Sequence, residues 1–258
     1  MKRNVLYCFI AIGVFYISPA DAQEDGSTDK KNRFIGLEAG ITPLSCETPE
    51  YDFIRGDVIS YYSGAYESLT SFMVKNHIGL KMEFRKKESK LGFLLGLRYA
   101  RLNATLGKES NSSSASGYFY FLNTQTGTTT EYLRVKEVNR TVDYIEVPIE
   151  ARRIFKTPFN LKLYLKVGAD LGFKIRSSSD VLFYNKGMSE YEDNVLARFD
   201  TPGFFTAAMY LSCGITFPTT PAIDIEFILP YLVLNPEMSG ILTSNGGVGL
   251  RAEFYLPF

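Results

Sequence analysis

The most constraining feature of this chain is a strict alternation of apolar and polar residues between Asn160 and Arg176. Every second side chain from Leu161 to Ile175 is apolar, whereas the positions between them include Lys162 and Lys166. A period of two residues is the signature of a β-strand with two different faces. The run is also longer than an average strand of a globular protein. It therefore predicts a long strand that separates an apolar environment from a polar one.

Seven further segments show the same alternation, so the sequence predicts eight strands. They span residues 34–42, 72–85, 91–105, 141–153, 205–218, 222–232 and 246–258. The connections after the second, fourth and sixth strands are short, whereas those after the first, third and fifth are long. Transmembrane barrels combine short periplasmic turns with long extracellular loops. We therefore expect an all-β fold, an eight-stranded antiparallel up-and-down transmembrane β-barrel.

Two other arrangements stay open at this level. A soluble β-sandwich could use the apolar face as its core, although it gives no reason for placing the long loops at one end. A barrel of ten strands would result if residues 57–68 formed an extra hairpin. Pro148 and Pro230 fall within predicted strands, where proline removes a backbone donor, so we expect a β-bulge at each.

The polar faces of the strands carry charges of both signs. If the apolar faces contact lipid, these charges lie inside a barrel just wide enough for side chains to fill. Because buried charges must be paired, we expect a network of ion pairs that plugs the lumen. Its predicted members are Glu38, His77, Arg98, Glu146, Glu150, Arg152, Lys162, Lys166, Asp170, Asp224, Glu226, Arg251 and Glu253.

The first residues have the pattern of an export signal. A basic start, Met1-Lys2-Arg3, precedes an apolar run from Val5 to Ser18, and Ala20-Asp21-Ala22 supplies the small residues of a cleavage site. We expect a signal peptide over residues 1–22, a short periplasmic segment over 23–32 and the barrel domain over 33–258. This places the protein in the outer membrane of a bacterium.

The ionisable side chains offer little for catalysis or cofactor binding. His77 is the single histidine and the three cysteines lack paired spacing, so no multi-histidine or zinc-ribbon metal site is expected. A lipid-modifying barrel enzyme would need a histidine beside a serine or carboxylate, and His77 is predicted to face the lumen, away from lipid. Lys plus Arg equals Asp plus Glu at 28 each, which gives no nucleic-acid footprint. We expect no catalytic, cofactor or metal site.

The long loops contain segments that resemble strand continuations. Tyr118, Phe119 and Tyr120 lie in one, residues 128–138 in a second and 180–184 in a third, and residues 194–199 could form a fourth. Such segments would raise a β-rim rich in exposed aromatics above the membrane. Two interpretations remain: the aromatics belong to the interfacial girdle, or they bind another envelope protein or a glycan.

Two motifs resemble a known family. The chain ends Phe254-Tyr-Leu256-Pro-Phe258, which resembles the C-terminal signature by which insertion machinery reads outer-membrane barrels. Residues 143–150, Asp-Tyr-Ile-Glu-Val-Pro-Ile-Glu, resemble the Tyr-Ile/Leu-Glu-Ile/Val-Pro motif of PorT-like and OmpX-like barrels, the porin family proteins of Bacteroidota. The resemblance implies outer-membrane lipids and the insertion machinery as partners. Most members of that family have no defined function.

The function favoured by these observations is a structural or interaction barrel, or a subunit of an envelope complex, without enzymatic activity. A narrow porin-like channel is the first alternative and a lipid-modifying barrel enzyme the second.

Overall fold

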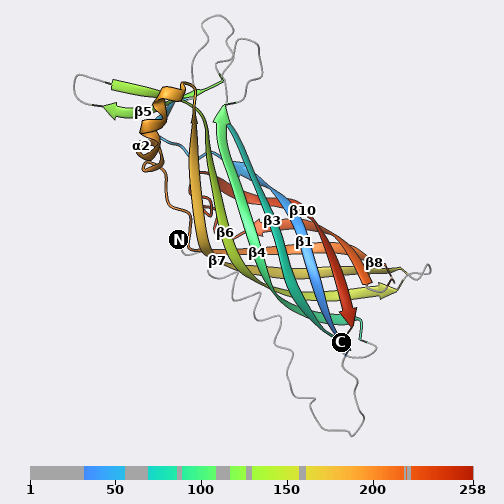
Figure 1. The fold of residues 1–258 in the computed structure, drawn as a ribbon. Helices are drawn as coiled ribbons and strands as arrows, with labels where there is room; N and C mark the ends of the chain where they lie inside the picture. Colours follow the sequence, from blue (N-terminus) through green and yellow to red (C-terminus); the bar gives the residue numbers. More distant parts are fainter. Residues whose placement is uncertain are drawn as a thin grey trace, which may run out of the picture. The chain divides into compact units, whose positions relative to one another are not determined.

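Eight strands of the chain form a closed antiparallel ring (Figure 1). The computed structural model describes residues 32–55, 69–85, 89–108, 117–125, 130–156, 161–217, 219 and 222–257. The predicted signal peptide, the predicted hairpin over 57–68 and Phe258 lie outside these residues. Nothing in the structure therefore tests them.

Around the ring the order is β1, β3, β4, β6, β7, β8, β9 and β10, and β10 pairs with β1 to close it. Short strands β2 and β5 extend the sheet at one end. The prediction of an eight-stranded barrel is confirmed. The strands are β1 (Asn32–Glu47), β2 (Ile54–Arg55), β3 (Leu69–Arg85), β4 (Leu91–Lys108), β5 (Phe119–Gln125), β6 (Thr130–Lys156), β7 (Lys162–Phe183), β8 (Phe205–Phe217), β9 (Ala222–Val233) and β10 (Thr243–Pro257).

The outer surface of the ring is an apolar belt. Leu37, Leu80 and Leu97 lie beside one another on β1, β3 and β4, and each leaves more than half of its surface exposed. Their chain neighbours Glu38, Lys81 and Arg98 are buried inside the ring. An apolar outer surface of this kind is stable only in contact with lipid, because a soluble protein would bury these leucines.

The two strand prolines differ in their effect on the ladder. Around Pro230, the register of β9 shifts against both β8 and β10, so the expected bulge is confirmed. Around Pro148, the registers of β6 with β4 and with β7 continue unchanged, so the bulge predicted there is wrong. The shifts in the β6–β7 pairing lie at Val135/Glu137 and at Asp143/Tyr144 instead.

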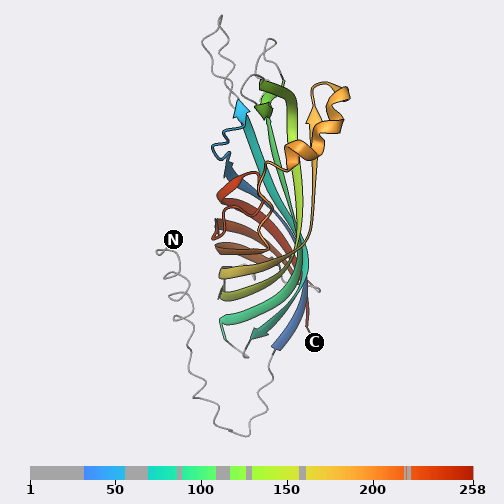
Figure 2. The same ribbon diagram turned by 90° about the vertical axis from the view of Figure 1, so that its left-hand side faces the viewer.

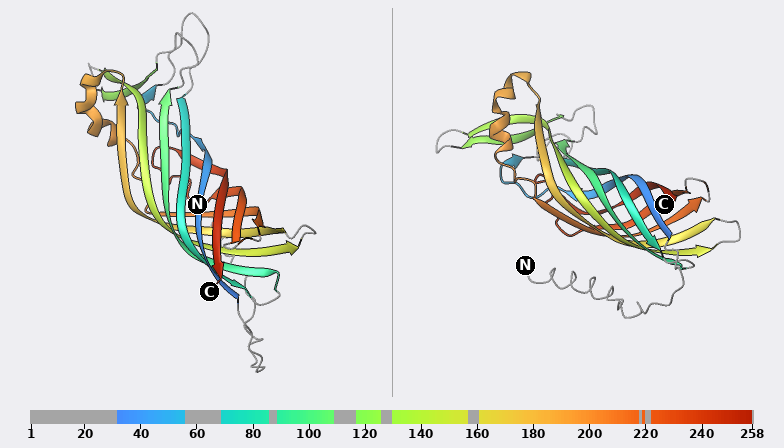
Figure 3. Two further views of the ribbon diagram at one scale, coloured as in Figure 1. Left: turned by 45° about the vertical axis from the view of Figure 1, so that its right-hand side comes forward. Right: turned by 60° about the horizontal axis from the view of Figure 1, so that its bottom comes forward.

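The wall rises far above the ring on one side (Figure 2). β6 has 27 residues and β7 has 22, and β5 pairs with the first part of β6. The predicted strand continuations are thereby confirmed over 130–138 and 180–183, whereas Tyr184 lies just beyond the end of β7. Figure 3 shows this rim at one end of the barrel and the start of β1 with the end of β10 at the other.

Residues 194–199, by contrast, form no strand, and that prediction is wrong. Residues 194–196 are the end of α2 (Glu192–Leu196), which directly follows η1 (Lys186–Tyr191), and residues 197–199 form the turn after it. Tyr191, Val195 and Phe199 recur every four residues and turn inward together, which is the spacing of one helix face. Glu192 also accepts a hydrogen bond from the backbone N–H of Val181 on β7, which attaches the helix to the rim.

Candidate functional site

The barrel interior has two zones of different chemistry. Toward the short turns it is filled by charged side chains, and toward the rim by an apolar cluster that includes Leu102, Leu106, Leu133 and Val138. The sequence pattern predicted a charged network in the lumen but gave no expectation of the apolar zone.

Arg98 on β4 lies at the centre of the charged zone. Its Nε donates to Glu38 Oε1 and its Nη1 to Asp170 Oδ2, both at 2.8 Å. Glu146 and Glu150 also lie within 4.0 Å of the guanidinium. Arg98 is almost completely buried, so its charge is stable only because carboxylates from β1, β6 and β7 converge on it.

Three carboxylates, those of Glu38, Glu150 and Glu253, place oxygens within 4.8 Å of one another. Lys81 Nζ lies 2.7 Å from Glu38, 2.8 Å from Glu150 and 2.5 Å from Glu253. Lys166 approaches Glu150 and Glu253 from the opposite wall. Two ammonium groups thus supply the positive charge that a metal ion would supply, and this cluster is an ion-pair centre.

Nearer the short turns, Arg152 pairs with Glu83 and Asp224. Arg251 Nη1 donates to Glu150 Oε1 at 2.6 Å, which ties the last strand to β6 across the lumen. Most partners in the zone come from different strands. The network therefore links the walls of the barrel through its interior.

Twelve of the thirteen predicted members are buried in the interior, all except Lys162. Lys162 is exposed at the first residue of β7, beside the short turn. Because β7 begins at this residue, the side chain lies at the end of the barrel, where the lumen opens to solvent. His77 is buried, but its Nε2 has no hydrogen-bond partner among the described residues, so it does not join the ion pairs.

The prediction missed several members of the network. Lys75, Lys81 and Glu83 share the inward phase of His77 on β3 and are buried in ion pairs. The sequence signal was present, because all four are separated by even numbers of residues and so share one face of the strand. Four tyrosines were also missed: Tyr164, Tyr210, Tyr231 and Tyr255.

Tyrosine rings pack over glycines that are their cross-strand partners in the β7–β8 ladder, Gly168 beside Tyr210 and Gly214 beside Tyr164. A Cβ added to Gly168 would clash with the Tyr210 ring, and one added to Gly214 would clash with the Tyr164 ring. These glycines thus make room for two rings, whose hydroxyls donate to Glu150 and Glu226. The interior of a narrow barrel is filled in this way by pairing large with small residues.

The apolar zone is covered by the segment between β9 and β10. Met238, Ser239, Gly240, Ile241 and Leu242 are all buried; we call residues 238–242 the cap. Gly240 has φ +71°, a left-handed conformation that glycine adopts without strain.

Side chains from the barrel and the first loop hold the cap. The hydroxyl of Tyr144 donates to the Met238 carbonyl at 2.8 Å, and that of Tyr51 to the Ile241 carbonyl at 3.1 Å. Burial and the nearby Asp200 carboxylate raise the pKa of Tyr51 to about 12. Its hydroxyl therefore remains a donor throughout the neutral range.

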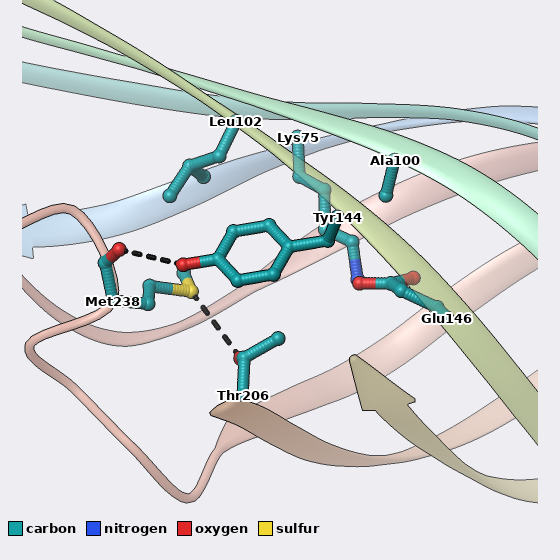
Figure 4. Close-up of a pocket in the computed structure, with 7 residues that line it drawn as sticks. All are labelled: Lys75, Ala100, Leu102, Tyr144, Glu146, Thr206 and Met238. Carbon is teal, nitrogen blue, oxygen red and sulfur yellow. Dashed lines mark hydrogen bonds and ion pairs between the residues drawn. The ribbon is translucent and has the colours of Figure 1, made fainter. Parts of the chain in front are cut away.

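A cavity of about 10 Å³ separates the cap from the charged zone (Figure 4). It is large enough for about one water molecule. The ring of Tyr144 reaches from β6 toward Met238, and the ammonium of Lys75 lies against Glu146 at 2.6 Å. The lining residues are Lys75, Ala100, Leu102, Tyr144, Glu146, Thr206 and Met238.

The three predicted rim aromatics do not share one environment. Tyr118 and Tyr120 face outward and are partly exposed, whereas Phe119 is buried beneath the rim in contact with the apolar zone. The prediction that Phe119 is exposed is wrong. Strand alternation explains the difference, since 118 and 120 share one face of the hairpin and 119 has the other.

At the C-terminal strand, Phe254 and Leu256 point outward and are exposed on the apolar belt. This orientation agrees with the predicted insertion signal, although its last residue, Phe258, lies outside the described residues. None of the described helices is long and apolar enough to cross a membrane.

A family model described as "Outer membrane protein beta-barrel domain" matches residues 22–219. The chain belongs to this family. The match covers most of the ring and, with the apolar belt, places the protein in the outer membrane. No curated protein matches the sequence.

Two solved structures are similar to this family member at low identity. The outer membrane protein OprG from Pseudomonas aeruginosa is 9% identical with a TM-score of 0.43, covering 88% of this chain and 97% of OprG. The transport unit of the autotransporter AIDA-I from Escherichia coli is 7% identical with a TM-score of 0.29, covering 97% and 95%. At these scores neither likeness carries an argument about function.

Proposed function

We propose that the protein is a structural or interaction barrel of the outer membrane, acting as a subunit of an envelope complex. In this proposal its lumen is plugged and its rim is the functional surface. The observation that carries the proposal is the pairing of buried charges across the lumen, from Glu38 and Arg98 to Glu150 and Arg251. An ion crossing the barrel would have to break these pairs, which is costly in a low-dielectric interior.

The cap supports the same proposal from the other end. Residues 238–242 close the apolar zone by hydrogen bonds from Tyr51 and Tyr144. A solute would therefore meet two barriers of different chemistry in series. A porin-like channel, the competing function, needs a continuous aqueous path.

Conductance in planar lipid bilayers tests this point. The refolded protein is inserted after heat-modifiable gel migration has shown that the barrel is closed, with a known porin as the positive control. We expect no steady current above the bare membrane. Stable unitary steps would instead make the protein a narrow channel and overturn the proposal.

We propose further that the protein is not an enzyme. His77, the single histidine, is buried in the lumen against Gly40, and its Nε2 contacts no serine hydroxyl or carboxylate among the described residues. A His77→Ala variant should leave the lipid A and phospholipid acylation of cells unchanged. A changed acylation pattern would revive the lipid-modifying alternative.

The finer placement of the protein is also a proposal. The motif around Pro148 and the C-terminal aromatic pattern support membership among the PorT-like porin family proteins of Bacteroidota. The N-terminal pattern supports export through a signal peptide over residues 1–22. The outward-facing Phe254 and Leu256 support recognition of the last strand by the insertion machinery.

Membership of a complex is tested in native membranes. After mild solubilisation, the protein is expected to migrate in native gels as a species larger than the barrel alone. Migration only as the free barrel, at the mass of the refolded protein, would contradict the subunit role.

A further inference from the structure

We propose that the outer face of the rim binds an acidic polysaccharide, whose sugar rings carry carboxylate groups. This inference rests on the proposed function, which makes the rim the functional surface, and it names the chemistry of the partner. The site is a strip formed by Tyr118, Tyr120, Tyr132, Tyr184, Arg134 and Lys136; we call it the tyrosine strip.

The four rings of the strip are in continuous contact across three strands. Centroid distances are 6.1 Å from Tyr132 to Tyr120, 5.4 Å from Tyr120 to Tyr118 and 4.8 Å from Tyr118 to Tyr184. Tyr184 leaves about half of its surface exposed. Together the rings form an aromatic platform on which the apolar faces of sugar rings can stack.

The opposite face of the same hairpin shows that these tyrosines are not a core. Phe119, Phe121, Leu133 and Val135 alternate with the strip residues and are buried almost completely. The hairpin thus places phenylalanine and aliphatic residues inward and tyrosine outward. Outward phenol groups can hydrogen-bond to water or to sugar hydroxyls, which phenylalanine could not do.

Two cations lie on the platform and give it a positive charge. The Arg134 guanidinium lies 5.2 Å from the Tyr118 ring centroid, and Lys136 Nζ lies 5.6 Å from that of Tyr184. A guanidinium near a ring face keeps N–H donors that match a carboxylate bidentately. None of the six strip residues is acidic, and the adjacent Glu137, which faces outward opposite Leu182, sets one carboxylate against the two cations. An anionic sugar complements this combination.

The position of the strip argues against a role as a membrane girdle. On the same outer face, between the apolar belt and the strip, lies a polar ladder: Thr105 donates to Asn139, Thr141 to Asn103, and Asn139 to Asp180. A girdle directly adjoins the apolar band, whereas Arg134 lies nine residues beyond Asp143, about 30 Å of strand. The strip therefore faces the medium outside the membrane.

The test measures binding by calorimetry to the full mature protein in detergent micelles. Three probes separate the contributions: oligogalacturonate, which has sugar rings and carboxylates; a neutral maltooligosaccharide of the same length; and polyglutamate, which has carboxylates without sugar. We expect oligogalacturonate to bind at least tenfold more tightly than either other probe. Added salt should weaken the binding.

Paired variants locate the site. Arg134→Gln/Lys136→Gln and Tyr118→Ser/Tyr184→Ser should each weaken oligogalacturonate binding at least tenfold. Tyr118→Phe/Tyr184→Phe keeps the stacking surface and should lose less. Arg176→Gln and Tyr99→Ser, outward residues outside the strip, should change the affinity less than twofold. Heat-modifiable migration must first show that every variant is folded.

Each other outcome overturns the inference. No binding of oligogalacturonate, or equal binding by the strip variants, removes the site. Equal binding of polyglutamate indicates an acidic protein partner, and equal binding of the maltooligosaccharide removes the role of charge. These results are independent of the proposed function, which fails on bilayer conductance or on the absence of a larger complex.

Discussion

Arg98 is the side chain on which the charged zone depends most directly. Replacing it with methionine keeps the volume but leaves Glu38 and Asp170 buried without their strongest partner. Removing one partner of a buried ion pair typically costs about 3–5 kcal/mol. We therefore expect Arg98→Met to lower the free energy of unfolding by about that amount, measured by urea titration of the refolded barrel.

The matched control is Arg101, three residues farther along β4 and on its outer face. It pairs with Asp143 at 2.8 Å, but half of its side chain is exposed. Because the Asp143 side chain is only 7% exposed, Arg101→Met should cost more than a fully exposed pair, which contributes about 0–1 kcal/mol, but clearly less than Arg98→Met, where both partners are buried. If both variants lost the same free energy of unfolding, the interior ion pairs would contribute no more to stability than this outward pair.

The close approach of Tyr210 to Gly168 makes a second prediction at the scale of single residues. Gly168→Ala places a methyl group against the ring, and overpacking of this kind costs about 1–3 kcal/mol. A Tyr210→Leu replacement in the same chain should recover part of the loss. Gly117→Ala is the control, because nothing lies within 4 Å of the added Cβ; a similar loss there would remove the packing explanation.

At the residue scale, the sequence predicted which residues of each strand face the interior. It did not predict how far along the barrel each of them lies. Alternation assigned Glu150 and Glu253 correctly to the interior. It could not show that Lys162 lies where the lumen opens, because that depends on where the strand starts relative to its neighbours. Nor could it show that the interior becomes apolar toward the rim, since Leu102 and Leu106 appear in the sequence as ordinary strand residues.

At the scale of elements, the hairpin of β5 and β6 has one structural and one exposed face. Phe119→Ser should destabilise the rim, because truncating a buried phenylalanine costs about 3–5 kcal/mol. Tyr118→Ser should have a much smaller effect, since that ring is partly exposed. Limited proteolysis of the folded barrel tests this: we expect new cleavage within residues 117–135 only in the Phe119 variant.

Cleavage that is equally fast in both variants would mean that the outward tyrosines also hold the hairpin. A replacement of residues 118–120 together cannot distinguish the two roles, because it removes the buried ring with the exposed ones. The variants of the tyrosine strip avoid Phe119 for this reason.

Elements that follow a simple period were predicted best. The hairpin alternates except at the shifts beside Leu122 and Val135, and both it and the upper part of β7 were expected from the sequence. The helix α2 was missed because the four-residue spacing of Tyr191, Val195 and Phe199 competes with a short alternating run in the same segment. Pro148 shows that a proline in a strand does not always predict a bulge. A strand can accept proline without a register shift where one of its two ladders is locally interrupted.

At the scale of the whole molecule, the alternation and the loop lengths sufficed to predict the ring. Eight apolar faces and three short turns at one end leave few other ways to close a sheet. The cap and the helical segment could not be predicted, because their contacts join loops distant in sequence. Tyr51 and Ile241, which hydrogen-bond to each other, show no shared pattern in the chain.

The whole-molecule prediction concerns the medium around the barrel. Leu80 and Leu182 are exposed to nearly the same extent, at 55% and 49%, but Leu80 lies in the apolar belt and Leu182 on the rim beyond the polar ladder. An arginine facing the lipid midplane costs about 2–4 kcal/mol, and one outside the bilayer costs little. We therefore expect Leu80→Arg to reduce the heat-modifiable folded fraction in lipid vesicles, whereas Leu182→Arg leaves it unchanged. If this same barrel were surrounded by water, both leucines would face water and both substitutions would be equally harmless, so equal behaviour of the two variants would contradict the membrane-spanning barrel.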